Sequence, residues 1–208
     1  MIILAYEHSV RSRTLTLQQI FKRISMQRKN AEISYVFDLD NTLIMTDDAN
    51  NQAYIDAIQM VIGQKPQFDI NGRFTRNDLR IAYPQLADDL FNRIVLAKQD
   101  WFDKYVDKTI LNVNLAKILR TLSQNGNETI LLTNCHRRRA THLCVHYNIH
   151  QFFCRHYYYE DSQYDKYSFL QNKGYDLRSV VLFENDSASM KMAIEKGICK
   201  ENIIAVKF

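Results

Sequence analysis

A pair of aspartates, Asp38 and Asp40, lies in the segment FDLDNTLI, directly after an apolar run. In an extended chain, side chains two residues apart point the same way, so both carboxylates would face one pocket. A carboxylate can attack a phosphorus atom and form an acyl phosphate. A second carboxylate can protonate the leaving oxygen and then deprotonate the attacking water. The pair therefore predicts phosphoryl transfer, with one carboxylate as the nucleophile and the other as the general acid and base.

Further polar residues follow two later apolar runs, TILL and VVLF, in the same way, and a lysine lies between them. Several carboxylates around one point would repel each other and need a divalent cation, and ligands that are all oxygen favour Mg²⁺. A lysine and a hydroxyl would neutralise and orient the phosphoryl oxygens. These residues are Thr133, Asn134, Lys166, Glu184, Asn185 and Asp186.

The elements that would hold these residues alternate along the chain. Apolar, β-branched runs predict strands at 33–39, 129–133, 180–184 and 203–208, with a short one in the aromatic-rich run 151–159. Amphipathic patterns predict helices at 115–122, 138–147, 167–173 and 187–196. Such alternation predicts an α/β fold, a Rossmann-like parallel sheet with helices on both faces. Ligands of such sheets bind at the carboxyl ends of the strands, where the polar residues lie.

Residues 47–108 have helix signals and no convincing strand. Apolar spacing predicts one helix around 53–61, a second that starts at Thr75 or Asn77 and stops before Pro84, and a third over 86–105. Near the start of the chain, 14–27 has the pattern of an amphipathic helix with a basic face. We interpret it as a helix that packs on the core, and the role of residues 1–32 stays open.

Four segments together resemble the motifs of the haloacid dehalogenase-like hydrolase superfamily. FDLDNTLI resembles the first motif in its DxDxT form, ILLTN the second, Lys166 the third and LFENDSASMKMAIEKG the fourth. The resemblance covers about residues 33–208. The stretch 47–108 is similar to the family's helical cap, and GRFTRNDLR (72–80) resembles caps of the phosphoglucomutase and phosphoglycolate phosphatase kind. The resemblance as a whole implies a core of 1–46 and 109–208, with 1–32 as an extension, and a small all-helical cap at 47–108 inserted after the first motif strand.

The resemblance also implies roles for single residues. Asp38 would be the nucleophile and a magnesium ligand, and Asp40 the general acid and base, with its backbone carbonyl on the metal. Thr133 and Asn134 would hold the phosphoryl group. Lys166 would stabilise its charge, and we prefer it to Lys173 because it precedes the helix.

The fourth motif departs from the family pattern. Aligned backward from Gly197, the principal metal-binding aspartate of the family falls on Asn185, which is flanked by Glu184 and Asp186. An amide oxygen can bind Mg²⁺ but contributes no charge. If the strand ends one residue later, Asp186 takes the role. We therefore expect Asp186 as the ligand and Glu184 as its helper, with Asn185 as the alternative.

The expected function is a Mg²⁺-dependent phosphatase that hydrolyses a small phosphate monoester through an aspartyl-phosphate. Haloacid dehalogenases resemble the first motif but lack its second aspartate, so Asp40 favours phosphate-ester chemistry. A phosphomutase would use the same residues, and a catalytically impaired binding or regulatory protein is the alternative that Asn185 raises. The expected partner is a small phosphorylated metabolite, with nucleotides and sugar phosphates as candidates. Arg137, Arg138 and Arg139 either contact a second anionic group of that substrate or form an exposed helix face.

Composition narrows the classes of protein. The 208 residues are 46% hydrophobic, and the net charge of +4 suits anionic substrates without requiring nucleic acid as a partner. The four cysteines form no CxxC pair, so we expect free thiols in a reducing compartment. Because no window has the apolar length of a signal or a membrane span, we expect a cytoplasmic protein without a membrane partner. The oligomeric state stays open.

Overall fold

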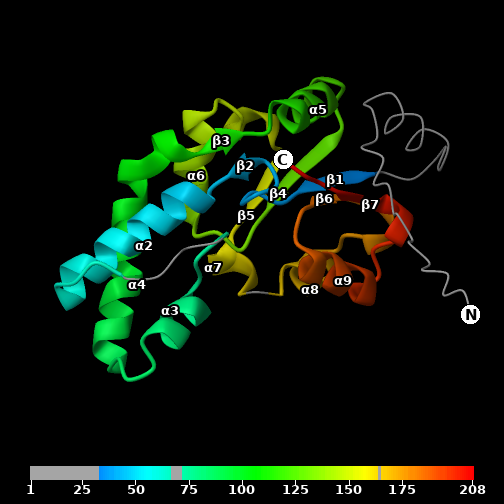
Figure 1. The fold of residues 1–208 in the computed structure, drawn as a ribbon. Helices are drawn as coiled ribbons and strands as arrows, with labels where there is room; N and C mark the ends of the chain where they lie inside the picture. The colour runs from blue at the N-terminus through cyan, green and yellow to red at the C-terminus, as the bar shows by residue number, and fades with distance from the viewer. Residues whose placement is uncertain (1–32, 67–71, 164) are drawn as a thin grey trace, which may run out of the picture. The chain divides into compact units, whose positions relative to one another are not determined.

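The computed structural model describes residues 33–66, 72–163 and 165–208, and the helix predicted at 14–27 lies outside them. Strands and helices alternate along these ranges (Figure 1). The strands are β1 Ser34–Phe37, β2 Ile44–Met45, β3 Ile110–Leu111, β4 Glu128–Leu132, β5 Arg155–Tyr157, β6 Val180–Glu184 and β7 Ile203–Ala205. The α-helices are α2 Asp47–Ile62, α3 Arg76–Ala82, α4 Asp88–Phe102, α5 Val113–Gln124, α6 Arg137–His146, α7 Tyr159–Ser162, α8 Lys166–Asn172 and α9 Ser187–Lys196. Short 3₁₀ turns include η1 Asp103–Lys108 and η3 Leu177–Ser179.

Five of the described strands form one sheet in the order β5-β4-β1-β6-β7. Each pairing in it is parallel, and β1 lies in the centre between β4 and β6. Both neighbours of β1 are rich in apolar residues and buried almost throughout, as expected for strands covered on two faces. The predicted Rossmann-like parallel sheet is thus confirmed, and the carboxyl ends of β1, β4 and β6 lie side by side.

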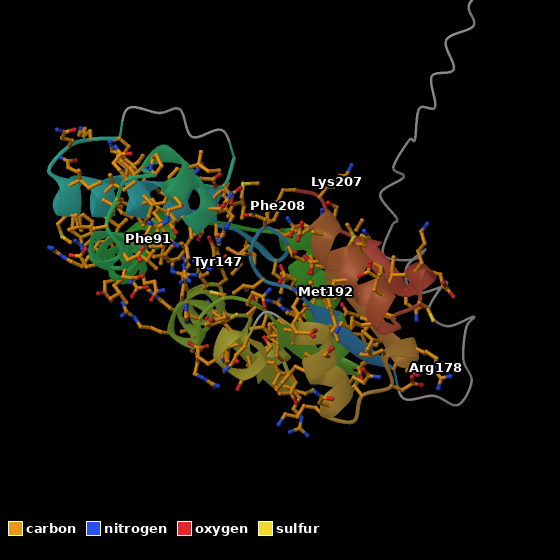
Figure 2. All side chains as sticks on the ribbon, turned by 90° about the horizontal axis from the view of Figure 1, so that it is seen from below. Phe91, Tyr147, Arg178, Met192, Lys207 and Phe208 are labelled. Atoms are coloured by element: carbon orange, nitrogen blue, oxygen red, sulfur yellow. The ribbon has the colours of Figure 1, made fainter. Side chains whose placement is uncertain are left out.

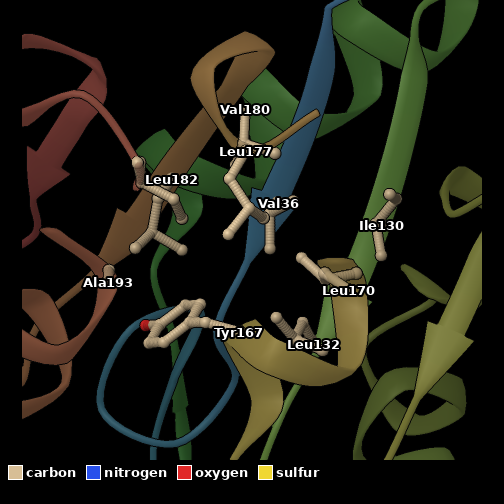
Figure 3. Close-up of a cluster of buried hydrophobic side chains, with 10 residues drawn as sticks. Val36, Ile130, Leu132, Tyr167, Leu170, Leu177, Val180, Leu182 and Ala193 are labelled. Carbon is tan, nitrogen blue, oxygen red and sulfur yellow. The ribbon is translucent and has the colours of Figure 1, made fainter. Parts of the chain in front are cut away.

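One face of the sheet packs against α8 and α9. Side chains of β1, β4 and β6 that point to this face meet Tyr167 and Leu170 of α8 and Ala193 of α9 (Figure 3). Each fully buried side chain of this kind stabilises the fold by about 1.5 to 3 kcal/mol. The cluster consists of Val36, Ile130, Leu132, Tyr167, Leu170, Leu177, Val180, Leu182, Ala193 and Ile198.

The opposite face is covered by α5 and α6. Phe37 and Phe183 alternate along their strands with the residues of the first cluster, so their side chains point to this opposite face. Their rings stack, with the centroids 4.4 Å apart. The helix α5 contacts β4, and Figure 1 shows α5 on the other side of the sheet from α8 and α9. Helices therefore cover both faces, as the alternation of elements predicts.

Between β2 and β3 the chain forms α2, α3, α4 and η1, which we call the helical segment. Its helices share buried residues of their own, including Tyr54, Ile58, Leu79 and Ile94. Phe91 packs against this cluster and lies among the side chains between the helices (Figure 2). The described residues of the segment contain the three helices that the apolar spacing predicts. Its boundaries as a separate cap domain stay a prediction.

Local signals explain where the helices begin and end. Thr75 caps α3 in a reciprocal pair with Asp78, so the second of the predicted helices starts after Thr75 rather than at Asn77. The helices α2 and α9 end at Gly63 and Gly197, which take left-handed backbone angles that favour glycine.

A two-stranded antiparallel ribbon, β2 with β3, joins the helical segment to the sheet at both ends of the segment. The sequence patterns did not predict these two-residue strands. Among the described helices, none combines the length and hydrophobicity that crossing a bilayer would require.

Candidate active site

Asp38 lies one residue past the end of β1, the central strand of the sheet. Its backbone N–H continues the parallel pairing by donating to the carbonyl of Phe183 at 3.0 Å. Its side chain is 9% exposed and accepts hydrogen bonds from Lys166 Nζ at 2.9 Å and from the Thr42 hydroxyl at 3.0 Å. The central position in the sheet thus places a buried carboxylate in a fixed orientation at the edge where ligands bind.

Lys166 begins α8 and points to the end of the sheet. Its ammonium also donates to Glu184 Oε2 at 2.8 Å, so one cation serves two buried carboxylates. Burial alone would lower the pKa of Lys166, but Asp38 and Glu184 raise it well above its ordinary value, so it stays charged. Lys173, the alternative for the third motif, is exposed and lies over the ring of Phe169.

The two carboxylates that share Lys166 differ in their protonation. Burial raises the pKa of Asp38 to about 7, with Lys166 lowering it and Glu184 raising it. The pKa of Glu184 is lowered, because Lys166 and several donors outweigh its burial. Those donors are the Tyr167 and Ser189 hydroxyls and the N–H groups of Asn185 and Asp186. Lys166 with Glu184 is thus balanced in charge, and ionised Asp38 adds one negative charge without compensation.

Asp40 has the opposite electrostatic environment. Its carboxylate bonds to Arg139 Nη2 of α6, lies 3.6 Å from Arg73 Nη2 of the helical segment, and accepts from the Thr46 hydroxyl at 2.7 Å. Burial alone would raise the pKa of Asp40, but Arg139 and Arg73 hold it well below its usual range. Asp40 is therefore ionised in this arrangement.

Thr133 and Asn134 follow β4, next to Asp38 across the sheet. Thr133 is buried, its N–H donates to Tyr157 at 3.0 Å, and its hydroxyl accepts from the N–H of Cys135 at 3.0 Å. Asn134 is exposed and lines the cavity at the site. The structure thus brings both residues to the edge of the sheet that holds Asp38.

The residues of the fourth motif take three different positions. The Asn185 amide oxygen lies 2.9 Å from the Thr42 hydroxyl, the same hydroxyl that bonds Asp38. Glu184 lies inward of it, bonded as described above. The Asp186 carboxylate caps α9 by accepting from the N–H groups of Ala188 and Ser189 at 3.2 and 3.0 Å. Asn185 therefore shares a hydrogen-bonding partner with Asp38, whereas Asp186, the ligand preferred from the sequence, is bonded to the start of α9. Which of them binds the metal stays a prediction.

A cavity of about 660 Å³ opens over these groups. It is lined by each of the predicted site residues and by residues outside that set. Of these, Arg73 and Arg139 matter most because they pair with Asp40. The run Arg137 to Arg139 was the available signal for Arg139. The signal for Arg73 was its place in the segment GRFTRNDLR, but that segment did not indicate which carboxylate Arg73 contacts.

The donor set suits a hard divalent cation. In the described ranges no group of three or more His, Cys, Asp or Glu side chains forms a ready metal cluster. Asp38 and Asn185 nevertheless supply oxygen atoms around Thr42, and ionised Asp38 leaves a negative charge to be balanced. Mg²⁺ commonly binds through one or two carboxylates and keeps several waters. The residues present therefore fit such an ion.

Comparisons with known proteins bear on the fold of this chain. A scan against protein-family models finds no match, and a search of curated proteins finds none either. Solved structures do match. A haloacid dehalogenase-like family hydrolase from Streptococcus pneumoniae is 19% identical, with a TM-score of 0.66 over 80% of this chain and 81% of that one.

Two further structures match over similar lengths. A predicted phosphoglycolate phosphatase from Haemophilus somnus is 13% identical, with a TM-score of 0.65 over 82% of this chain and 84% of that one. A β-phosphoglucomutase from Clostridium difficile is 14% identical, with a TM-score of 0.62 over 85% and 84%. At such low identities the shared property is the arrangement of the chain. Residues 33–208, where the structure describes them, therefore have the fold of the haloacid dehalogenase-like hydrolases.

Proposed function

We propose that this protein is a phosphatase that hydrolyses a small phosphate monoester through an aspartyl-phosphate on Asp38. The observation that carries the proposal is the position of Asp38. It is a buried carboxylate at the end of the central strand, held by Lys166 at 2.9 Å and lining an open cavity with Asp40 two residues further on. The fold that the chain shares with phosphatases and phosphoglucomutases supports it.

In the first step an oxygen of Asp38 attacks phosphorus and the bond from phosphorus to the leaving oxygen breaks. Lys166 stabilises the charge on the phosphoryl oxygens, and Thr133 and Asn134 orient them. Burial of Asp38 raises its pKa to about 7, so near neutral pH only part of the protein holds the nucleophile in its ionised form. A cation beside Asp38 would lower this pKa and favour the reactive form.

Asp40 moves the protons. It donates one to the leaving oxygen, and it then takes one from the water that attacks phosphorus as the bond to Asp38 breaks. Donation requires a protonated Asp40, whereas Arg139 and Arg73 keep it ionised. The acid step therefore requires that the guanidinium groups turn from Asp40 toward the bound substrate.

Mg²⁺ is the cofactor that we propose, held by the carboxylate of Asp38, the backbone carbonyl of Asp40 and the amide oxygen of Asn185. When bound, it would neutralise charge on Asp38 and on the phosphoryl group. Glu184 and Asp186 support the site indirectly, Glu184 by anchoring Lys166 and Asp186 by capping α9. The predicted preference for Asp186 as the ligand is kept as the alternative.

The expected substrate is a small phosphorylated metabolite. The helical segment supplies Arg73 and Thr75 to the cavity wall, so it takes the part of a cap over the site. A phosphomutase is the second candidate, because one of the structures that share this fold is a β-phosphoglucomutase.

Hydrolysis of p-nitrophenyl phosphate, with Mg²⁺ and with EDTA, tests the proposal. We expect activity that needs Mg²⁺ and falls at least about 1,000-fold in Asp38→Asn, because the nucleophile is lost. Trapping of phosphate on the protein in Asp40→Asn, by mass spectrometry, would show the aspartyl-phosphate. Absence of activity toward a panel of phosphorylated metabolites, with no metal bound, would instead favour a binding or regulatory protein.

Two further variants separate the candidate metal ligands. Asn185→Asp adds a charge beside Asp38, so we expect tighter Mg²⁺ binding by calorimetry, and Asn185→Ala should weaken it. Asp186→Asn serves as the matched control, because asparagine caps a helix about as well as aspartate. A large loss of Mg²⁺ affinity in Asp186→Asn, with none in Asn185→Ala, would return the assignment to Asp186.

A further inference from the structure

A second cavity, of about 310 Å³, adjoins the one over Asp38. Arg73, Thr75, Asn134 and Arg139 line both cavities, so the two share a wall. The second cavity lies between the helical segment and α6, and its volume falls at the lower end of the range for small-molecule sites. A substrate that places its phosphate at Asp38 can therefore extend its leaving group into this space.

The charges that line the second cavity are unbalanced. Its lining includes five Arg and Lys side chains, whereas Asp103 is the only carboxylate among the described lining residues. Three of the cations already have partners, since Arg73 and Arg139 pair with Asp40 and Arg138 pairs with Asp103. The other two are Arg76 and Lys98, for which no ion pair with another described residue is found.

Lys98 of α4 is the unusual member of this pair because it is 93% buried, with 7% of its surface exposed. No hydrogen bond or ion pair links it to the other described residues. Its ammonium lies 5.0 Å from the ring of Tyr54 and 5.6 Å from that of Phe102. Burying a charged group without a hydrogen bond or an ion pair costs several kcal/mol, which either lowers the pKa of the group or favours an anionic ligand beside it.

Burial, followed by repulsion from Arg139 and Arg73, lowers the pKa of Lys98 to about 6. Among the charged neighbours, Arg139 and Arg73 lower the pKa of Lys98 and Asp40 raises it, so Asp40 offsets the repulsion only in part. An anion bound there would relieve that repulsion and keep Lys98 protonated.

We infer that the second cavity binds an anionic group on the leaving-group side of the substrate, with Lys98 and Arg76 as its cationic partners. This inference rests on the proposed function and narrows its substrate class. The substrate would be a phosphate monoester that carries a second anion, either a carboxylate or another phosphate. The apolar rings of Tyr54 and Phe74, which line the same cavity, would contact the carbon chain between the two anions.

Phosphonates test the inference without turnover, because their carbon–phosphorus bond resists hydrolysis. The probes are propylphosphonate with one anionic group, 3-phosphonopropanoate with an added carboxylate, and propane-1,3-bisphosphonate with a second phosphonate. Binding is measured by calorimetry on the full chain with Mg²⁺. We expect at least one of the two-anion probes to bind about 10-fold or more tightly than propylphosphonate. The probe with the higher affinity, 3-phosphonopropanoate or propane-1,3-bisphosphonate, shows whether the second anion is a carboxylate or a phosphate.

Lys98→Met is the decisive variant, because methionine fills a similar volume without the charge. It should abolish most of the preference for the two-anion probe. The matched control is Lys104→Met, which removes an exposed lysine that lies over the ring of Trp101, outside the cavity. Thermal unfolding checks that Lys98→Met folds, and loss of a buried charge is expected to leave its Tm equal or higher.

Two results would overturn the inference. One is equal affinity of the original protein for all three probes, and the other is a preference that persists in Lys98→Met. Hydrolysis of p-nitrophenyl phosphate, measured on the same preparations, separates this question from the proposed function. If the protein hydrolyses p-nitrophenyl phosphate but shows no preference for the two-anion probes, the anion site is refuted and the phosphatase proposal stands. If the preference depends on Lys98 but no hydrolysis is seen, the phosphatase proposal is refuted and the anion site stands.

Discussion

The ammonium of Lys166 lies 2.9 Å from an Asp38 oxygen and 2.8 Å from a Glu184 oxygen, so a single buried cation holds two carboxylates from neighbouring strands together. The strands β1 and β6 pair in parallel, which brings the two acids to the same edge. Without the cation, both carboxylates would lose their compensating charge in a buried environment. Lys166 therefore contributes to folding as well as to the proposed chemistry.

Lys166→Met should lower the free energy of unfolding by about 3 to 5 kcal/mol at pH 8, because breaking a buried ion pair leaves an uncompensated charge. At pH 5 the loss should be smaller, since Asp38 can take a proton. Urea denaturation at the two pH values measures this. The control is Lys173→Met, an exposed lysine directly after the end of α8, for which a change above about 0.5 kcal/mol is not expected. An equal loss at pH 5 and pH 8 would contradict the electrostatic explanation.

Asp38→Asn should change how stability depends on pH. The pKa of Asp38 is raised from 3.8 to about 7 in the folded protein, so the unfolded chain releases that proton first. The contribution of Asp38 to stability is thus full below about pH 4 and is lost as the pH rises through 7. In EDTA, Asp38→Asn should gain stability relative to the original protein between pH 4 and pH 8, by at most about 4 kcal/mol. A difference that stays constant over this range would show that the pKa is not raised.

Arg139 and Asp40 should be energetically coupled. Removing one partner leaves the other partly buried without its ion pair, whereas removing both leaves no uncompensated charge. Arg139→Gln and Asp40→Asn should therefore cost less together than the sum of the single changes, with a coupling of about 1 to 3 kcal/mol. Urea denaturation of the four proteins gives this value. The control is Arg137→Gln, which changes an exposed arginine on the same helix. If the effects of Arg139→Gln and Asp40→Asn are fully additive, the prediction is wrong.

The cysteines should differ in reactivity. Cys135 and Cys144 are buried, and burial raises the pKa of each thiol to about 12, so neither forms much thiolate at neutral pH. Cys154 is exposed and should be alkylated by iodoacetamide in the folded protein. Peptide mass spectrometry before and after denaturation distinguishes the sites. Rapid labelling of Cys135 in the folded protein would mean that its environment is open.

The apolar patterns predicted the sheet well because its strands are buried on both faces. VVLFE and the helix after it, 187–196, have the predicted ends in the structure. The expected strand 33–39 is shorter in the structure, Ser34–Phe37, although the Asp38 N–H still donates to the Phe183 carbonyl. The ribbon of β2 and β3 was not predicted, because two-residue strands carry too few residues for a periodic pattern.

The site could be predicted in part. The grouping of Asp38 with Thr133 follows from strand ends, because a parallel sheet collects those ends at one edge, and Lys166 follows from its place at the start of a helix. The pairing of Asp40 with Arg73 and Arg139 could not be read in this way. It joins three separate segments, and only their packing decides which carboxylate an arginine contacts. The same reason explains why the position of Asn185 against Thr42 differs from the preference for Asp186.

The ribbon of β2 and β3 also limits how the helical segment can move. The chain leaves for this segment after Met45 and returns at Ile110, and these two residues are paired with each other. Any rotation of the segment relative to the sheet would have this pair of short strands as its hinge. Rotation about it would carry Arg73 and Lys98 away from Asp40 while leaving Asp38, Lys166 and Glu184 in place, because those three belong to the sheet and the helix on its face. Opening would admit substrate without disturbing the nucleophile, and closing would restore the cationic wall around it.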